Sequence, residues 1–154
     1  MYRPNVCIVI INKTRTKVLM FRRIGATDYC WQFPQGGVDD GESEIEAFCR
    51  ELKEEIGTND VKLIRVSQKR IKYEFPEWVL EKMAEKGIDK SNFKGQKQRW
   101  FLVQLNRGLK SIRFDHEPAE FDACKWVAPE KVLEKIVPFK RKAYQRGLHS
   151  LDIL

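Results

Sequence analysis

Histidine and closely spaced cysteines are what this chain conspicuously lacks. His116 and His149 are its only histidines, so a metal site built from several imidazoles is not expected. The cysteines show none of the spacings typical of metal ligands or redox pairs; they are Cys7, Cys30, Cys49 and Cys124. Cys7 and Cys49 fall on apolar segments and are expected to be buried thiols, which favours a reducing cytoplasm.

Long hydrophobic runs are also missing. A bilayer-spanning helix needs about 20 apolar residues, and the longest early run, 6–11, is too short and wrongly flanked for a signal peptide. There is no internal repeat, low-complexity segment or interdomain linker. With 154 residues, 42% of them hydrophobic, the sequence predicts one soluble domain over 1–154, away from membranes.

Positive charge is abundant, with a net charge of +7 and a pI near 9.3. The excess is strongest from Lys125 onward. That part has seven basic residues, Lys125, Lys131, Lys135, Lys140, Arg141, Lys142 and Arg146, against three acidic ones, Glu130, Glu134 and Asp152. Such a patch suits a polyphosphate or nucleic-acid partner, although many basic faces bind nothing specific.

One stretch, Gly36 to Gly57, has the sequence GGVDDGESEIEAFCRELKEEIG. Ser43 and Glu46 form a capping box, which predicts a helix start, and Gly57 is placed to end the helix with a positive φ. Apolar residues recur at helical spacing and predict one buried stripe. These residues are Ile45, Phe48, Cys49, Leu52 and Ile56.

The same helix carries Glu51, Glu54 and Glu55 within about a third of its circumference. Three carboxylates so close repel one another, and oxygen-only ligands favour a hard divalent cation such as magnesium, manganese or calcium. Arg50 can hold one of these carboxylates in orientation. The alternative is a solvated acidic helix face, which is the usual interpretation of a Glu-rich run.

The remaining pattern predicts alternating strands and helices. Expected strands are a hairpin of 5–11 and 17–21, a short strand at 30–33, one or two strands over 61–73, a strand at 99–105 and a short one at 126–127. Expected helices, besides the capped one, are 76–86, 129–137 and 139–151. This order points to an α/β fold with helices on both faces of a mixed sheet.

Seven residues of the capped stretch match the pattern of the Nudix box: Gly36, Glu42, Arg50, Glu51, Glu54, Glu55 and Gly57. The chain therefore resembles the Nudix hydrolase superfamily. It departs from the pattern at Thr58, where the family usually has an apolar residue, and this leaves the acidic side chains untouched. The resemblance implies an α/β/α sandwich with a mixed β-sheet between helices, and a magnesium-dependent hydrolase of nucleoside diphosphates linked to a further group.

Further blocks resemble the bacterial RNA pyrophosphohydrolase subfamily and, almost equally, dinucleoside polyphosphate hydrolases. These blocks are Tyr2–Val6, Trp31–Gly37, Gly95–Phe101, Glu120–Asp122, Trp126–Val127 and Phe139–Arg141. Between Arg70 and Gly95 the chain departs from the RNA type and looks more like the dinucleoside polyphosphate type, because a mixed-charge segment replaces the Lys-Arg-rich one common in RNA-type members. Fewer positive charges there would weaken the attraction for a long RNA backbone.

The resemblance implies metal-binding and catalytic roles for particular residues. Glu51, Glu54 and Glu55 would bind Mg²⁺, with Mn²⁺ as a substitute, and Arg50 would orient them. Glu120 matches an additional glutamate that completes metal binding or acts as general base, although Ala119 stands where the family often has proline and an ordinary exposed glutamate is the alternative. The Gly37 carbonyl oxygen could be a further metal ligand.

On the substrate side, Arg3 and Lys140 match positions that contact 5′ phosphates, and Arg23 and Phe139 match positions that hold a base. A guanidinium plane and an aromatic ring suit stacking without close sequence readout. Gln96 and Lys97 would add contacts. For Phe139, a role as core anchor of the last helix is the alternative.

The leading hypothesis is removal of pyrophosphate from the 5′-triphosphate end of RNA to leave a monophosphate, which the resemblance links to the start of mRNA decay. The runner-up is cleavage of dinucleoside tetra- or pentaphosphates. A third hypothesis is a non-catalytic module that binds nucleotides, against which the complete acidic triplet argues. No DNA partner is expected, and the sequence indicates no particular protein partner.

Overall fold

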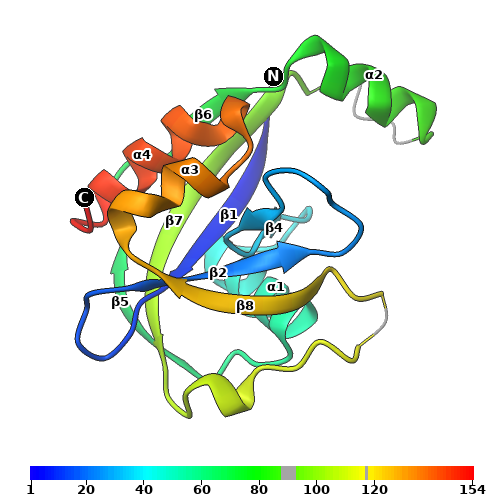
Figure 1. Cartoon of the computed structure of the whole chain (residues 1–154). Coiled ribbons are helices and arrows are strands. Elements are labelled where there is room, and N and C mark those ends of the chain that lie inside the picture. Colours follow the sequence, from blue (N-terminus) through cyan, green and yellow to red (C-terminus); the bar gives the residue numbers. More distant parts are fainter. Residues whose placement is uncertain (88–92, 117) are drawn as a thin grey trace.

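The fold is seen in a computed structural model that describes residues 1–87, 93–116 and 118–154 (Figure 1). The segment 88–92, inside the stretch where the sequence departs from the RNA type, lies outside the described residues. The strands are β1 Tyr2–Ile10, β2 Val18–Arg23, β3 Trp31–Gln32, β4 Gln35–Gly37, β5 Val61–Val66, β6 Ile71–Glu74, β7 Gly95–Leu105 and β8 Phe121–Val127. The helices are α1 Glu44–Ile56, α2 Glu77–Glu85, α3 Val132–Lys135 and α4 Arg141–Ser150.

The larger sheet is mixed, in the order β4-β1-β7-β5, with β6 also paired to β7. β1 and β7 run parallel, and the other pairs are antiparallel. A second, antiparallel sheet has the order β3-β2-β8. The mixed sheet confirms the expected α/β class, and the second sheet is an addition to it.

The hairpin expected from 5–11 and 17–21 is wrong. β1 and β2 enter different sheets, and only a bridge between Ile11 and Val18 joins them. The reason is burial, since residues 6–10 and 18–21 are all fully buried. Strands covered on both faces belong in the interior of a layered structure, whereas an isolated hairpin would expose one face to water.

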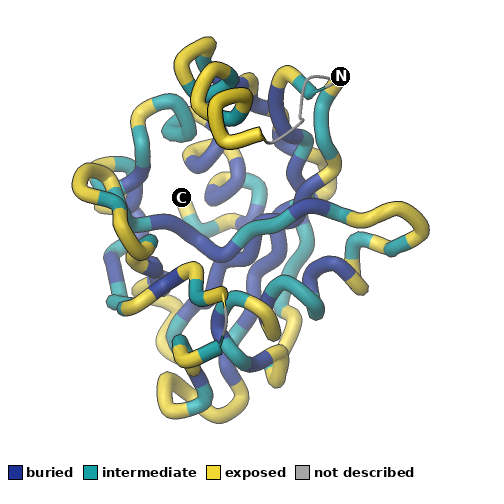
Figure 2. The backbone as a smooth tube through the Cα atoms, turned by 90° about the vertical axis from the view of Figure 1, so that its right-hand side faces the viewer, coloured by how far each residue is buried: buried dark blue, intermediate teal, exposed yellow. Residues whose placement is uncertain are grey.

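α1 and α4 cover opposite faces of the mixed sheet (Figure 1). Alternate residues of β1 supply the two cores: Val6, Ile8 and Ile10 pack with α1, while Cys7 and Val9 pack with α4. Figure 2 shows the buried segments running through the centre of the molecule and the exposed ones in the outer turns. The period of two in a strand thus divides one segment between two helical layers.

α1 begins and ends as its sequence predicts. Ser43 and Glu46 form the capping box, and Gly57 adopts φ 79° at the C-terminus. The predicted stripe is wrong at its edge, because Ile45 is 49% exposed and Ala47 is buried in its place. Cys49 is only half-buried, while Cys7 is fully buried as expected.

Several boundaries differ from the sequence prediction. The segment 61–73 forms two strands, β5 and β6. β7 begins at Gly95 rather than at the expected residue 99. Its first residues include Gln96 and Gln98, which are buried and hydrogen-bonded, and a hydrophobic pattern cannot reveal such polar strand residues. β8 covers seven residues rather than the expected two.

The expected helix 129–137 is reduced to a 3₁₀ turn, Pro129–Lys131, followed by α3. A second 3₁₀ turn, Pro138–Lys140, precedes α4, since Pro138 has no N–H to continue a helix. α2 follows Pro76 as predicted but contributes no buried residue. Within the described ranges, every helix is too short or too polar to cross a bilayer.

Candidate active site

A chain of polar contacts positions the short strand β4, where the chain turns into the site. Asn5 on β1 donates to the Gln35 side chain at 2.9 Å and accepts from Gln98 on β7, also at 2.9 Å. The Gln35 backbone N–H then donates to Glu55 Oε2 of α1 at 3.1 Å. Hydrogen bonds from the sheet and from α1 therefore both hold the chain at Gln35. They also supply the partners that buried polar groups need.

Gly36 lets this turn approach α1. A Cβ at Gly36 would lie 1.9 Å from the carboxyl carbon of Glu51, so only glycine leaves room for that side chain. Gly37 is similarly close to a charged group, because a Cβ there would lie 2.2 Å from a guanidinium nitrogen of Arg3. These two glycines bring backbone, Glu51 and Arg3 into one place.

Arg50 forms ion pairs with several carboxylates of the acidic cluster. Its guanidinium contacts Glu42 and Glu51 at 2.8 Å and Glu54 at 3.2 Å, and it donates to the Gly37 carbonyl oxygen at 2.8 Å. The hydrogen bond from Arg50 lowers the pKa of Glu42 to about 2, and these partners raise the pKa of Arg50. Arg50 thus ties the turn to the helix, as its predicted orienting role requires.

The four predicted glutamates line one cavity of about 560 Å³, which also contains Lys53, His116 and Pro118. Burial, together with the negative charges of Glu51 and Glu120, raises the pKa of Glu55 to about 9. Burial also raises the pKa of Glu51, against the opposing effect of Arg50. Glu120 and Glu54 are exposed to the solvent side of the cavity.

The four glutamates of the cavity offer only carboxylate oxygens, which are the ligands that a hard divalent cation prefers. One of them, Glu55, is buried beside like charges that such a cation would neutralise. Among the described residues, no three acidic, cysteine or histidine side chains converge into a complete ligand set. Glu51 and Glu54 are turned toward Arg50 instead. Arg50 therefore fixes the orientation in which these carboxylates would be offered to a metal ion.

A second cavity, of about 890 Å³, contains Arg23, Phe139 and Lys140. Its walls come from the 23–29 loop, α2 and the turn before α4. We call it the nucleotide cavity, after the base-holding role that the sequence predicts for Arg23 and Phe139. The phenyl ring of Phe139 meets Trp78 edge-on, with 5.9 Å between ring centroids. Phe139 is half-buried against the core, as the anchor alternative expects, and it also lines the cavity. Its role in holding a base stays a prediction.

Lys140 and Glu120 link the two cavities. Burial lowers the pKa of Lys140 to about 8, opposed by the nearby charges of Glu120 and Glu55. The backbone N–H of Ile24 donates to the Glu120 carbonyl oxygen at 3.1 Å, which ties the 23–29 loop to the acidic cavity. The loop that lines one cavity is therefore tied to a residue that lines the other.

Gln96 and Lys97 cannot both face the same ligand, because neighbouring residues of a strand project to opposite faces. Gln96 is 5% exposed, pairs with Arg3 across the strands and accepts a hydrogen bond from Tyr73. Lys97 shares a face with Arg99, which pairs with Glu44 at the start of α1 at 3.2 Å. Neither side chain lines the acidic or the nucleotide cavity.

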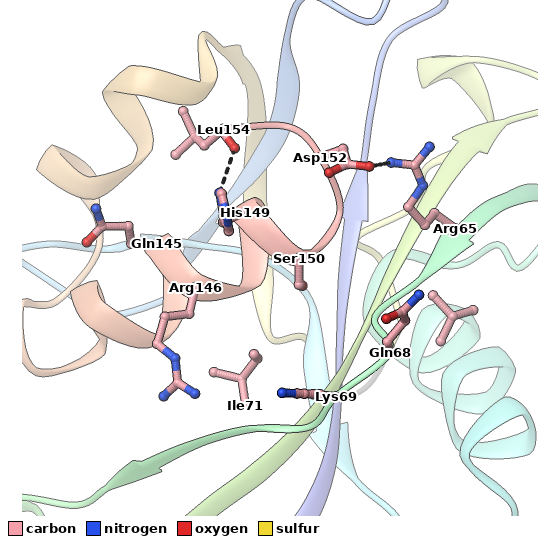
Figure 3. A pocket seen from close by; sticks show the side chains of 11 residues that line it. Arg65, Gln68, Lys69, Ile71, Gln145, Arg146, His149, Ser150, Asp152 and Leu154 are labelled. Atoms are coloured by element: carbon pink, nitrogen blue, oxygen red, sulfur yellow. Dashed lines mark hydrogen bonds and ion pairs between the residues drawn. The ribbon is translucent and has the colours of Figure 1, made fainter.

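Another cavity, of about 970 Å³, lies between α4 and the β5–β6 segment and contains no predicted site residue (Figure 3). We call it the α4 groove. Its cationic side chains include Lys69 and Arg146, and its Arg65 forms an ion pair with Asp152 (Figure 3).

Some residues at these cavities were not predicted from the sequence. Trp78, Val79, Lys82 and Met83 of α2 line the nucleotide cavity. The three- and four-residue intervals from Val79 to Lys82 and Met83 identify one helix face but not its partner. Both ring nitrogens of His116, which lines the cavity with the glutamates, are buried and have no hydrogen-bond partner among the residues that the structure describes. A lone histidine in a loop offers no sequence signal for this placement.

Comparison with known proteins gives a consistent family assignment. A NUDIX domain model matches residues 1–147. A Rickettsia typhi protein named RNA pyrophosphohydrolase is 38% identical over 153 residues, which cover 99% of this chain and 91% of that protein. A Helicobacter pylori protein of the same name is 40% identical over 148 residues, covering 94% and 90%.

Solved structures agree at the level of the fold. An Escherichia coli dihydroneopterin triphosphate pyrophosphohydrolase superposes with a TM-score of 0.67 at 22% identity, covering 95% of this chain and 96% of that one. A Caenorhabditis elegans Ap4A hydrolase binary complex superposes with a TM-score of 0.63 at 18% identity, covering 99% of each. The chain belongs to the NUDIX domain family.

Proposed function

We propose that this protein is a divalent-cation-dependent hydrolase that removes pyrophosphate from the 5′-triphosphate end of RNA and leaves a 5′-monophosphate. The observation that carries the proposal is the acidic cavity lined by four glutamates, tied by the Ile24–Glu120 backbone hydrogen bond to the loop of a second cavity that Lys140 lines. The relatives named RNA pyrophosphohydrolase, at 38–40% identity over nearly the whole chain, support this substrate.

In this proposal Glu51, Glu54, Glu55 and Glu120 hold Mg²⁺, or Mn²⁺ in its place, with the Gly37 carbonyl oxygen as a further ligand. The metal, when bound, neutralises phosphate charge and makes water more acidic. Arg50 keeps Glu51 oriented through its 2.8 Å contact, and Gly36 leaves the space that this carboxylate needs. Glu120, which lines the same cavity and is exposed, accepts a proton from water in this proposal.

The cationic and aromatic residues then have separate roles. Arg3 and Lys140 bind the 5′ phosphates, with Gln96 supporting Arg3 from the neighbouring strand. Arg23 and Phe139 hold a base in the nucleotide cavity, where planar groups accept any base. Lys97, on the opposite face of β7, contributes only long-range positive charge to a polyphosphate.

Cleavage of dinucleoside polyphosphates is the second candidate. Trp78 stands edge-on to Phe139 in the nucleotide cavity and comes from the segment that departs from the RNA type. A second aromatic ring there would suit a ligand with two bases. A non-catalytic nucleotide-binding module is the third candidate.

We also propose that residues 1–154 form a single domain that works in the cytoplasm. All four cysteines are free, which fits a reducing compartment. The family match over residues 1–147 fits one domain.

The candidates are separated by turnover of triphosphorylated RNA and diadenosine tetraphosphate at matched concentration. We expect RNA to be the better substrate. RNA turnover at background level with rapid cleavage of the dinucleotide would replace the first candidate by the second.

The substitution Glu54→Gln tests catalysis itself. Glu54 is 57% exposed, so its loss should barely change the melting temperature. We expect kcat to fall by about two orders of magnitude or more, since a lost metal ligand acts on the chemical step. Unchanged turnover in this variant would favour the non-catalytic module, provided that the variant is folded.

A further inference from the structure

Positive side chains gather around Trp31 on the smaller sheet, at residues that have no role in the proposed reaction. Lys125 Nζ lies 4.1 Å from the centroid of the Trp31 ring, and Arg22 Cζ lies 5.9 Å from it. Strand pairing places them together, because Arg22 is the partner of Trp31 in β2–β3 and Lys125 lies on the adjacent β8. With Lys135 of α3, these residues form what we call the Trp31 cluster.

The charges of this cluster are largely uncompensated. Arg22 has a carboxylate partner, Asp122, at 2.8 Å. Within the part of the chain that the structure describes, Lys125 and Lys135 form no ion pair with a carboxylate. Partial burial lowers the pKa of Lys125, and repulsion from Lys135 lowers it further. A bound anion would relieve this repulsion, while the indole ring holds the Lys125 ammonium in place by a cation–π contact.

The Trp31 cluster adjoins the nucleotide cavity through Tyr29. This residue lines the cavity, is 45% exposed, and lies under Arg141, whose Cζ is 5.4 Å from the ring centroid. Tyr29 and Trp31 are two residues apart in the sequence, and each ring carries a cationic side chain over its face. Aromatic and cationic groups are therefore interleaved beside the cavity, an arrangement typical of surfaces that follow a single-stranded nucleic acid.

We propose that the Trp31 cluster binds the phosphodiester backbone of RNA nucleotides that follow those held in the nucleotide cavity. This inference rests on the proposed function and extends it from the 5′ end to the downstream strand. Lys125 and Lys135 supply charge to the phosphates without reading the base sequence. A dinucleoside polyphosphate has no downstream strand, so the cluster would favour RNA over that substrate.

The test is binding of 3′-fluorescein RNA with a 5′-monophosphate, a dinucleotide and an octanucleotide, measured by fluorescence anisotropy with Mg²⁺ at several salt concentrations. Two charge-matched variants are compared with the unmodified chain. K125Q/K135Q neutralises the Trp31 cluster, and K69Q/R146Q neutralises two cations of the α4 groove (Figure 3). Thermal melting verifies that each variant is folded.

We expect the octanucleotide to bind the unmodified chain more tightly than the dinucleotide does. K125Q/K135Q should weaken octanucleotide binding by about 10-fold and reduce its log–log salt slope by about 1.4, leaving dinucleotide binding unchanged. K69Q/R146Q should behave as the unmodified chain.

Equal affinity of the unmodified chain for both lengths would overturn the proposal, as would equal losses for both lengths in K125Q/K135Q. The proposal would also be overturned if K125Q/K135Q left octanucleotide binding intact. The same holds if K69Q/R146Q weakened octanucleotide binding as much as K125Q/K135Q does. Failure of the proposed function would be visible separately, as no pyrophosphate release from a triphosphorylated octanucleotide by the unmodified chain.

Discussion

At the scale of single residues, Glu55 is the group whose charge the fold disfavours most clearly. Burial and the charges of Glu51 and Glu120 raise its pKa from the ordinary value of 4.5 to about 9. A carboxyl with a raised folded-state pKa contributes stability that is complete below pH 4.5 and is lost as the pH rises through about 9. The metal-free protein should therefore weaken across this range.

Glu55→Gln removes this pH dependence. We expect the metal-free variant to match the unmodified chain near pH 4.5 and to melt at a higher temperature near pH 9. The gain should be about 2–4 °C for each kcal/mol recovered. Glu54→Gln, on the exposed side of the same helix, is the control and should show no such gain. A constant difference between E55Q and the parent at all pH values would contradict the assignment.

Arg50 is the other residue with several partners at once. Arg50→Lys keeps the charge but not the fork that contacts Glu42, Glu51 and the Gly37 carbonyl oxygen. We expect Mn²⁺ binding to weaken by about 10- to 100-fold in this variant. Binding is measured as the loss of the EPR signal of free Mn²⁺. R107K, whose ion pair with Asp60 lies on the surface, should bind Mn²⁺ normally. Equal Mn²⁺ affinity in R50K and in the unmodified chain would contradict the orienting role of Arg50.

At the scale of the elements, α4 lies close to the mixed sheet because Gly147 faces the indole ring of Trp100. A Cβ at Gly147 would lie 2.3 Å from that ring. Gly147→Ala should therefore destabilise the protein by about 1–3 kcal/mol, measured by urea unfolding, as overpacking does in cores. Gln145→Ala, on the exposed side of α4, should change stability by less than about 0.5 kcal/mol. Unchanged stability in G147A would mean that α4 can move away at no cost.

At the scale of the whole molecule, α1 uses one face for packing and another for the acidic cavity. Phe48, Leu52 and Ile56 pack in the core, whereas Glu51, Glu54 and Glu55 line the cavity. Chelation with EDTA should thus abolish hydrolysis and leave the fold intact. Added Mg²⁺ should raise the melting temperature, with about 2.7 kcal/mol gained at a hundredfold excess over its Kd. E54Q should flatten this response. Unfolding by EDTA, or a melting temperature indifferent to Mg²⁺, would contradict this separation.

The sequence predicted best where neighbouring residues decide the structure. The capping box at Ser43, the stop at Gly57 and the acidic face of α1 depend only on helix geometry, and each is found in place. It predicted poorly where distant residues decide. β1 pairs with β7, nearly a hundred residues away, rather than with its neighbour β2, because both strands need cover on two faces.

By itself, then, the sequence determined the local chemistry of this protein: which residues form α1, which carboxylates share its face, and the family to which the pattern belongs. Only the tertiary structure decided what those groups meet. It brought Glu120 and Lys140 to the α1 glutamates, placed Trp78 of α2 against Phe139, and separated Gln96 from Lys97. The physical reason is that a helix or turn is set by contacts a few residues apart, whereas cavities form where separate layers meet.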